Sequence, residues 1–197
     1  MTAKASEAQL ADLWTQLEAL PPHLKGEIID GELHVQSRPR FRHARVGGFF
    51  SRHLGGGFDY DEGGPGGWWI VPEPGIELPD APEVSPDLGG WKRERMPVPP
   101  DDAPIRIVPD WVCELLSRSN ARWDRTVKLP FYARVGVRWL WLVDPRDQTI
   151  DVYQLHDSRW SLLRSFGEEA TMRAEPFDAI EIPLARLWLP PSPGGSG

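Results

Sequence analysis

The spacing of hydrophobic residues predicts two amphipathic helices and a hairpin in the first third of the chain. Apolar residues recur every three or four positions over residues 6–20 and again over residues 40–54, which is the period of a helix with one buried face. Three glycines at 55–57 follow the second segment, and we expect them to end it. Residues 27–35 indicate a β-hairpin, because Asp30-Gly31 suits the type I′ turn that joins two antiparallel strands.

Further along the chain, short β-prone runs surround one longer helical segment. Residues 110–116 and 137–143 are predicted strands, and residues 121–135 between them are a predicted helix in which Pro130 favours a kink or a local break. A strand, a helix and a strand in this order imply a parallel pair. The neighbouring hairpins imply antiparallel pairing, so the expected fold is an α/β domain with a mixed β-sheet and helices on its faces. The other expected elements are strands at 68–71, 75–78 (continuing the previous strand after a bend), 86–91, 149–155 and 159–165, and a short helix at 183–188.

One carboxylate interrupts the most apolar of these strands. Glu114 lies inside Pro109-Asp-Trp-Val-Cys-Glu-Leu-Leu, and a continuous hydrophobic run is typical of a strand buried on both faces. An ionised glutamate there costs several kcal/mol unless a cation or hydrogen-bond donors compensate it. A polar turn at 117–120 and a basic segment with Lys128 follow, so this region is a candidate metal and phosphate site. The alternative is an edge strand whose Glu114 faces solvent.

The composition fits a single globular domain without a disulfide. The 197 residues are 40% hydrophobic and 26% charged, which is enough for one substantial core. The one cysteine excludes an internal disulfide and a cysteine-based zinc cluster. The first residues lack the apolar segment of a signal peptide, and no apolar stretch approaches the length of about 18 residues that crosses a bilayer. We therefore expect a cytoplasmic protein without a membrane partner.

Charge is distributed unevenly along the chain. The formal net charge of −7 by itself disfavours a nucleic-acid partner. Residues 33–58 nevertheless contain five arginines and no acid, and residues 118–138 contain six basic residues against Asp124 alone. Each segment therefore has a net charge of +5, which leaves −17 on the rest of the chain. This asymmetry indicates one side that faces an anion, the alternative being two ordinary solvated helix faces.

Two acids on neighbouring predicted strands could hold a metal ion. Asp87 begins one strand and Glu114 lies in the next. Two hard oxygen ligands, with waters and backbone carbonyls completing the shell, are how proteins usually hold Mg²⁺. Lys128 could then act as a point charge on a metal-bound water or a phosphate. The alternatives are that Asp87 is a turn acid after a proline and that Lys128 forms an ion pair with Asp124, one helical turn away.

Several segments of the chain resemble one protein family. Glu27-Ile-Ile-Asp-Gly-Glu-Leu, Ser85-Pro-Asp-Leu and above all the block 109–145 resemble the Uma-two family of restriction endonucleases. The likeness covers about residues 10–165. It implies the PD-(D/E)XK nuclease fold, a restriction-endonuclease-like mixed β-sheet flanked by helices. We therefore expect a single domain over 1–197, with a C-terminal extension at 166–190 and a flexible tail at 191–197.

The resemblance also implies roles for residues already singled out. Asp87 corresponds to the "PD" acid and Glu114 to the "D/E" acid, both of them metal ligands in the family. Leu116 occupies the place of the signature lysine, so the catalytic lysine is expected to have moved to the following helix as Lys128. Glu27 resembles the additional N-terminal acid of such nucleases.

The expected activity is Mg²⁺- or Mn²⁺-dependent hydrolysis of DNA phosphodiester bonds. Asp87, Glu114 and the backbone carbonyl of Leu115 would hold the ion, and Lys128 would stabilise the developing negative charge. The rival expectation is a catalytically inactive nuclease-like fold that serves as a nucleic-acid-binding or regulatory module. The oligomeric state stays open, with a homodimer as one option. The residues expected to contact nucleic acid are Arg40, Arg42, Arg45, Ser117, Ser119, Arg122 and Arg125, the two serines being alternatively helix caps.

Overall fold

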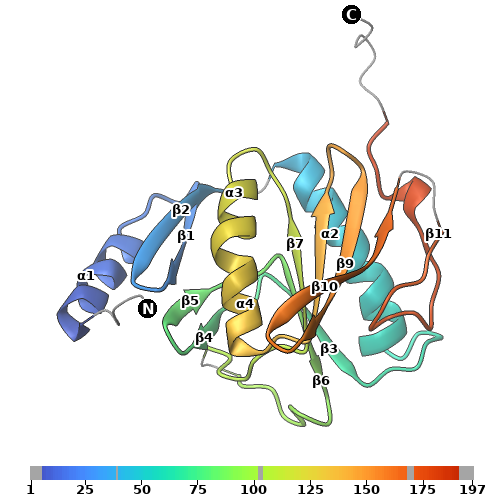
Figure 1. The fold of residues 1–197 in the computed structure, drawn as a ribbon, viewed down its shortest axis with the longest axis horizontal. Helices are drawn as coiled ribbons and strands as arrows, with labels where there is room; N and C mark the ends of the chain where they lie inside the picture. The colour runs from blue at the N-terminus through green and yellow to red at the C-terminus, as the bar shows by residue number, and fades with distance from the viewer. Residues whose placement is uncertain (1–5, 39, 102–103, 168–170, 191–197) are drawn as a thin grey trace, which may run out of the picture.

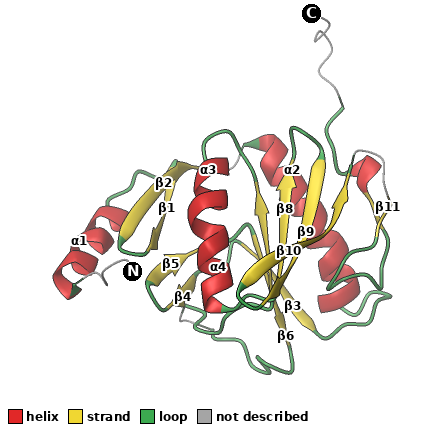
Figure 2. Cartoon of the chain, viewed as in Figure 1, coloured by secondary structure: helices red, strands yellow, loops and turns green. Residues whose placement is uncertain are grey.

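A six-stranded mixed sheet forms the centre of the protein, whose computed structural model describes residues 6–38, 40–101, 104–167 and 171–190. Its strands are β3 (Trp68–Pro72), β6 (Leu88–Lys92), β7 (Trp111–Leu115), β8 (Trp139–Asp144), β9 (Thr149–His156) and β10 (Arg159–Phe166). They lie in the order β10-β9-β8-β7-β6-β3 (Figures 1 and 2). Only β7 and β8 pair in parallel among these strands. The mixed sheet and its predicted parallel pair are confirmed, whereas the tail predicted at 191–197 lies outside the described residues.

A smaller four-stranded sheet lies beside the first. It consists of β1 (Leu24–Ile29), β2 (Glu32–Ser37), β4 (Ile76–Leu78) and β5 (Ala81–Val84), in the order β2-β1-β5-β4. The predicted hairpin turn is confirmed, because Asp30 and Gly31 have φ angles of 53° and 77°. The prediction that 75–78 extends the preceding strand is wrong, since β4 belongs to this second sheet after the bend at Pro72-Glu-Pro. A third sheet pairs β11 (Thr171–Met172) with β12 (Ile182–Pro183).

The two predicted N-terminal helices form, but the glycines do not end the second one. The helix α1 (Glu7–Glu18) begins with a capping box at Ser6. The helix α2 (Phe41–Leu54) continues directly into a π-helical turn, η1 (Gly55–Asp59). Gly55 keeps a right-handed φ of −57° and its carbonyl accepts from Tyr60 N–H. Gly55 thus lacks the left-handed conformation with which a glycine commonly ends a helix, and the helical backbone continues through it.

The predicted helix at 121–135 consists of three parts. α3 (Ala121–Trp123) and α4 (Leu129–Val135) flank a π-helical turn, η2 (Asp124–Lys128). The irregularity predicted from Pro130 thus lies just before the proline, which itself occupies the first turn of α4. At the C-terminal end the expected short helix is a 3₁₀ turn, η3 (Leu184–Arg186). No helix in the described ranges is long and apolar enough to cross a membrane.

Two hydrophobic clusters cover the two faces of the central sheet. Trp111, Cys113 and Leu115 of β7 pack into the cluster that contains α2, and Val112 packs into the cluster that contains α4. This alternation is the period-two pattern of a strand buried on both sides. The segment at 166–190 contributes to the first cluster through several buried side chains, so it packs against the sheet. These side chains are Met172, Ala174, Phe177, Ile182, Leu184, Leu187 and Trp188.

Candidate functional site

The strand that carries Glu114 is a central strand of the sheet. β7 pairs antiparallel with β6 and parallel with β8, and all five of its residues are buried. Glu114 itself is 1% exposed, so the alternative of a solvent-facing edge strand is wrong. Because Val112 packs on the α4 side, the alternation along the strand directs Glu114 to that side as well.

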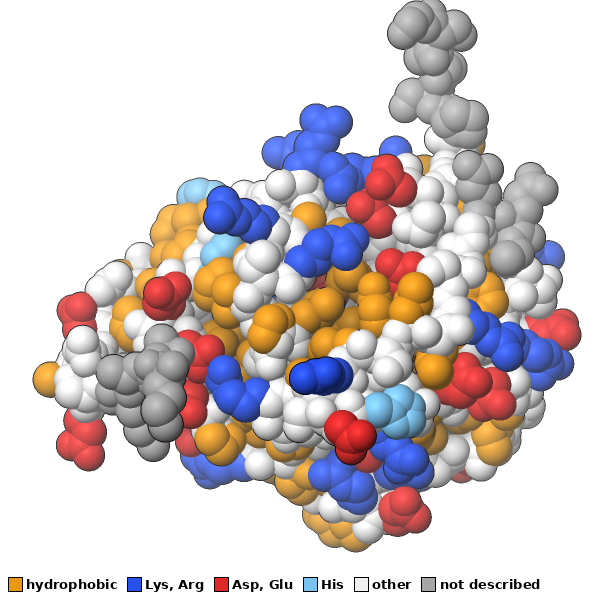
Figure 3. Space-filling view, viewed as in Figure 1, with side chains coloured by type: hydrophobic (Ala, Val, Ile, Leu, Met, Phe, Trp, Pro, Cys, Tyr) orange, Lys and Arg blue, Asp and Glu red, His pale blue; other side chains and the backbone are white. Residues whose placement is uncertain are grey.

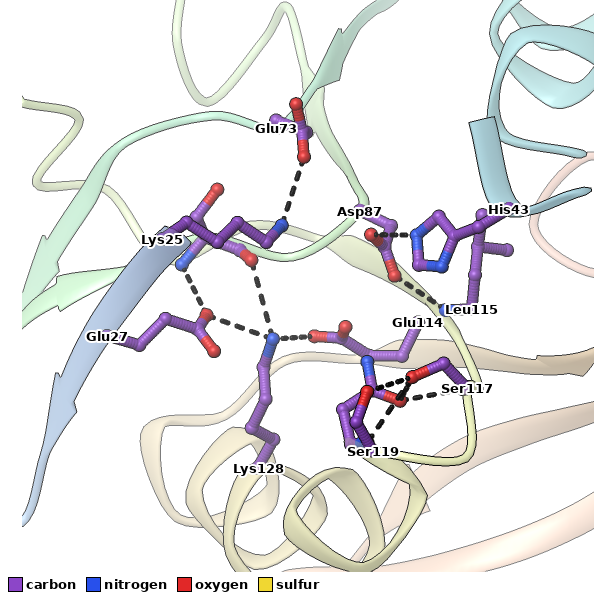
Figure 4. A network of polar contacts seen from close by, with 12 residues as sticks. Lys25, Glu27, His43, Glu73, Asp87, Glu114, Leu115, Ser117, Ser119 and Lys128 are labelled. Atoms are coloured by element: carbon purple, nitrogen blue, oxygen red, sulfur yellow. Dashed lines mark hydrogen bonds and ion pairs between the residues drawn. The ribbon is translucent and has the colours of Figure 1, made fainter. Parts of the chain in front are cut away.

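Two donors from the η2–α4 helix hold the Glu114 carboxylate. Lys128 Nζ lies 2.7 Å from Glu114 Oε1 (Figure 4), and the Tyr132 hydroxyl donates to the same oxygen at 2.6 Å. Burial raises the pKa of Glu114 to about 7; Lys128 opposes this rise, while the charges of Asp87 and Glu27 add to it. A carboxyl group with such a pKa can exchange a proton near neutral pH, which is a property of acid–base catalysts.

Lys128 bridges acids from the two sheets. Its Nζ lies 3.0 Å from Glu27 Oε1 on β1 and 2.7 Å from Glu114 Oε1 on β7, and the residue is 1% exposed. It also donates to the backbone carbonyl of Ser85 at 3.4 Å. Burial alone would lower the pKa of Lys128, but Glu114 and Glu27 outweigh it and hold that pKa well above its ordinary value. The buried lysine is therefore charged.

Lys128 does not form the ion pair with Asp124 that helical spacing suggested; its ion pairs within the described residues are those with Glu27 and Glu114. The cause is η2, in which Leu129 N–H donates to Asp124 O. A bond between residues five apart widens the turn, so side chains four apart no longer stack. Asp124 Oδ2 is instead buried without a hydrogen-bond partner in the described part of the chain. Burial, followed by the charge of Glu114, raises the pKa of Asp124 to about 9.

Glu27 has one satisfied and one unsatisfied oxygen. Ser85 N–H donates to Oε1 at 2.8 Å, and Lys128 faces the same atom. Oε2 is buried and has no hydrogen-bond partner among the described residues. A buried carboxylate oxygen without a donor is costly. This atom is therefore available to a cation or a water molecule.

Asp87 lies directly before β6 and is held by α2 and β7. His43 Nε2 lies 2.7 Å from its Oδ1, and Leu115 N–H donates to its Oδ2 at 2.7 Å (Figure 4). Burial alone would raise the pKa of Asp87, but the hydrogen bond and charge of His43, with two nearby lysines, outweigh it and hold that pKa below its ordinary value. The bond to Leu115 ties Asp87 to the peptide unit that follows Glu114. The predicted adjacency of their two strands is confirmed.

Two partners of the acidic residues, His43 and Tyr132, were not predicted from the sequence. The contact between His43 and Asp87 joins residues 44 positions apart, and no local pattern indicates such a pair. Tyr132 could have been predicted more easily, because it follows Lys128 by one helical turn. A buried tyrosine on the same stripe as a candidate lysine is a natural partner for the acid that the lysine faces.

The carboxylate oxygens of the site are ligands that suit a hard divalent cation. Asp87 and Glu114 lie at neighbouring strands, and the buried Oε2 of Glu27 lacks a donor. Carboxylate oxygens are the ligands that Mg²⁺ prefers. In the described ranges, no group of three or more His, Cys, Asp or Glu side chains is gathered closely enough to hold a metal ion. An ion would therefore take further ligands from water and from backbone oxygens such as the Leu115 carbonyl.

Four of the seven residues predicted to contact nucleic acid line one pocket of about 440 Å³. These four are Arg40, Arg42, Ser117 and Ser119, brought together from the start of α2 and from the turn after β7. Arg45 instead donates to the carbonyl of Arg186 at 3.0 Å. Arg122 and Arg125, on the α3–η2 helix, are not among the lining residues of this pocket.

Comparisons with known proteins assign the chain to a family. The family model for Uma2, described as "Putative restriction endonuclease", matches residues 14–185. A solved structure from Anabaena variabilis, described as a "putative nuclease", is similar with a TM-score of 0.68 and 19% sequence identity, covering 89% of this chain and 96% of that chain. At this identity the likeness concerns the fold alone, and it confirms the predicted nuclease-like α/β fold. A search of curated proteins finds no match. Because the family model spans most of its length, the chain belongs to the Uma2 (Uma-two) family.

Proposed function

We propose that the protein is a divalent-metal-dependent nuclease that hydrolyses the phosphodiester bonds of DNA. Membership of the Uma2 family supports a nuclease. The observation that carries the proposal is the buried ion cluster in which Lys128 contacts Glu27 and Glu114 beside Asp87. Charges buried together in this way are costly to maintain, and ionisable groups with shifted pKa values gather preferentially at functional sites.

Each residue of the cluster has a role in this proposal. Asp87, Glu114 and the Leu115 carbonyl would hold Mg²⁺ or Mn²⁺, with Glu27 Oε2 nearby as a further oxygen. When bound, the ion would act as a Lewis acid on the phosphate and lower the pKa of a bound water. Lys128 would place a fixed positive charge beside the phosphate as negative charge develops.

Other side chains would orient a metal ligand and attract the nucleic acid. His43 would keep the Asp87 carboxylate in one orientation through its 2.7 Å contact, as groups behind metal ligands commonly do. Arg40 and Arg42, at the N-terminal end of α2, would neutralise a phosphate next to the cleaved bond. Such contacts contribute affinity without reading the sequence.

The test is cleavage of supercoiled and single-stranded DNA with Mg²⁺ or Mn²⁺ at matched salt. Asp87→Asn and Glu114→Gln keep the side-chain shape and remove the charge, and each is expected to reduce cleavage about 100-fold or more. Glu77→Gln is the matched control. Glu77 pairs with Arg106 at 2.8 Å and is 39% exposed, so its loss should leave the cleavage rate at the parent value.

The outcomes separate the nuclease from the alternatives. Cleavage that persists equally in the parent, Asp87→Asn and Glu114→Gln would come from a contaminating enzyme. A parent protein that cuts neither substrate with either ion would contradict the proposal. Retained DNA binding in that case would favour the nuclease-like binding or regulatory module.

A further inference from the structure

The pocket beside the candidate site has no acidic side chain among the described residues that line it. It occupies about 440 Å³ between the end of β2, the start of α2 and the turn after β7, which is within the range of pockets that hold small ligands. Among its lining residues Leu116, Asn120 and Pro145 are buried. These three residues form the floor of the pocket.

Four guanidinium groups at this pocket have no carboxylate partner among the described residues. They belong to Arg38, Arg40, Arg42 and Arg118. The contacts of two of them are with uncharged backbone: Arg42 donates to the Pro145 carbonyl at 3.1 Å and Arg38 to that of Pro22. On the face shown in Figure 3, by contrast, basic and acidic side chains are interspersed. In a chain of net charge −7, this local excess of positive charge indicates an anionic ligand.

Asn120 adds uncharged donors to the floor of the pocket. Its Oδ1 accepts from the backbone N–H and the hydroxyl of Ser117, at 2.7 and 2.8 Å. Because a backbone N–H can only donate, the atom that faces it is the oxygen, and the amide nitrogen is directed elsewhere. Asn120 is 5% exposed and lines the pocket. An amide NH2 group at this position can donate to a phosphate oxygen.

The pocket adjoins the proposed reaction centre. His43 lines the pocket and also contacts Asp87. Leu116 and Ser117, which line it as well, follow Glu114 along the chain. An anion in the pocket would therefore lie beside the phosphate that the proposed nuclease attacks, as the next charged group of the same strand.

We propose that this pocket binds the terminal phosphate of a nucleic-acid strand whose adjacent phosphodiester bond lies at Asp87 and Glu114. This inference rests on the proposed nuclease function and adds a preference to it: a strand with a phosphorylated end binds more tightly than a strand without one. A phosphomonoester carries about −1.5 to −2 charges at pH 7, more than an internal diester, which matches several guanidinium groups without counter-charge.

Binding measurements test the pocket separately from the cleavage reaction. The full-length protein in EDTA is titrated against internally labelled single-stranded DNA of about ten nucleotides, a length within ordinary single-strand site sizes. One probe has a 5′-phosphate, one has a 3′-phosphate, and the third ends in hydroxyls and is one nucleotide longer, so that the number of phosphates matches. We expect one phosphorylated probe to bind about tenfold more tightly than the hydroxyl probe, a difference of about 1.4 kcal/mol.

Variants then test whether the pocket causes the preference for a phosphorylated probe. Arg40→Gln and Arg118→Gln should each reduce it to about twofold or less, since each removes a charged donor for the phosphate. Arg173→Gln is the control, because Arg173 is an exposed arginine that pairs with Glu181 outside the pocket, and it should keep the full preference.

Equal affinity of the parent for the three probes would overturn the assignment, and so would a preference that survives both pocket variants. Since no measurement requires cleavage, the two proposals fail separately. An end preference in a protein that does not cut DNA would leave the phosphate pocket standing and refute the nuclease. Cleavage of DNA without a preference for phosphorylated ends would support the nuclease and refute the phosphate pocket.

Discussion

Replacing Lys128 tests whether the buried ion cluster stabilises the fold. Methionine has a similar length and no charge. Lys128 is 1% exposed, and its Nζ lies 3.0 and 2.7 Å from the Oε1 atoms of Glu27 and Glu114, so Lys128→Met leaves two buried carboxylates without a cation. Removing one partner of a buried ion pair costs about 3–5 kcal/mol. Because the pKa of Glu114 is already about 7, this acid can take up a proton, and the loss should lie near the lower end of that range.

Urea unfolding followed by tryptophan fluorescence measures this loss. We expect a free energy of unfolding about 3 kcal/mol below the parent value, with an unchanged denaturant slope. The double variant Lys128→Met/Glu114→Gln should be more stable than Lys128→Met, since one of the orphaned charges is gone. Lys92→Met is the matched control: Lys92 pairs with the exposed Glu94 at 3.7 Å, and its loss should cost less than about 1 kcal/mol. A cost that small for Lys128→Met, or a double variant less stable than the single one, would refute the reasoning.

Three further predictions address the ion, the pH dependence and the α2 helix. Mg²⁺ or Mn²⁺ at about a hundredfold excess over its Kd should stabilise the parent by about 2.7 kcal/mol, and an equal rise in melting temperature for Glu114→Gln would mean that the ion binds elsewhere. Asp124 has a pKa of about 9 in the folded protein against about 4 in the unfolded chain. Its contribution to the free energy of unfolding is therefore full below pH 4 and is lost as the pH rises toward 9. Asp124→Asn should raise the stability to urea more at pH 8 than at pH 5, and an equal effect at the two pH values would contradict this. A Cβ at Gly48 would meet no atom within 4 Å, so Gly48→Ala should raise the free energy of unfolding by about 0.5–1 kcal/mol, and a loss measured by urea unfolding would count against the helix geometry.

The local parts of the site followed from the sequence, because they depend on neighbours along the chain. An acid in a continuous apolar strand, followed by a basic helix, indicated Glu114 and Lys128 as candidates before any fold was known. The alternative for Lys128, an ion pair with Asp124, assumed 3.6 residues per turn and is wrong. The π-helical turn η2 changes that spacing, and the periodicity of apolar residues does not indicate such a turn.

The long-range parts of the site could not be predicted in the same way. The contact of Lys128 with Glu27 depends on how the small sheet docks against the α3–α4 helix, and the contact of Asp87 with His43 depends on the position of α2. Hydrophobic spacing determines which face of each element is buried, but it does not determine which buried faces meet. For example, β4 follows β3 after the bend at Pro72-Glu-Pro, but the two strands belong to different sheets.

The resemblance to PD-(D/E)XK nucleases predicts a lysine at the position of Leu116, and the absence of that lysine has a physical explanation. Leu116 follows Glu114 by two residues and is packed in the cluster on the α4 side at 3% exposure, so a lysine there would bury a cation among apolar side chains. The η2 turn presents Lys128 to Glu114 Oε1 on that same side. Lys128 also pairs with Glu27, so its buried ammonium group has a second counter-charge. A lysine on the strand would need a second counter-charge of its own. Lys128 thus places a positive charge beside Glu114 from the helix, and the proposed role of Lys128 depends on this arrangement.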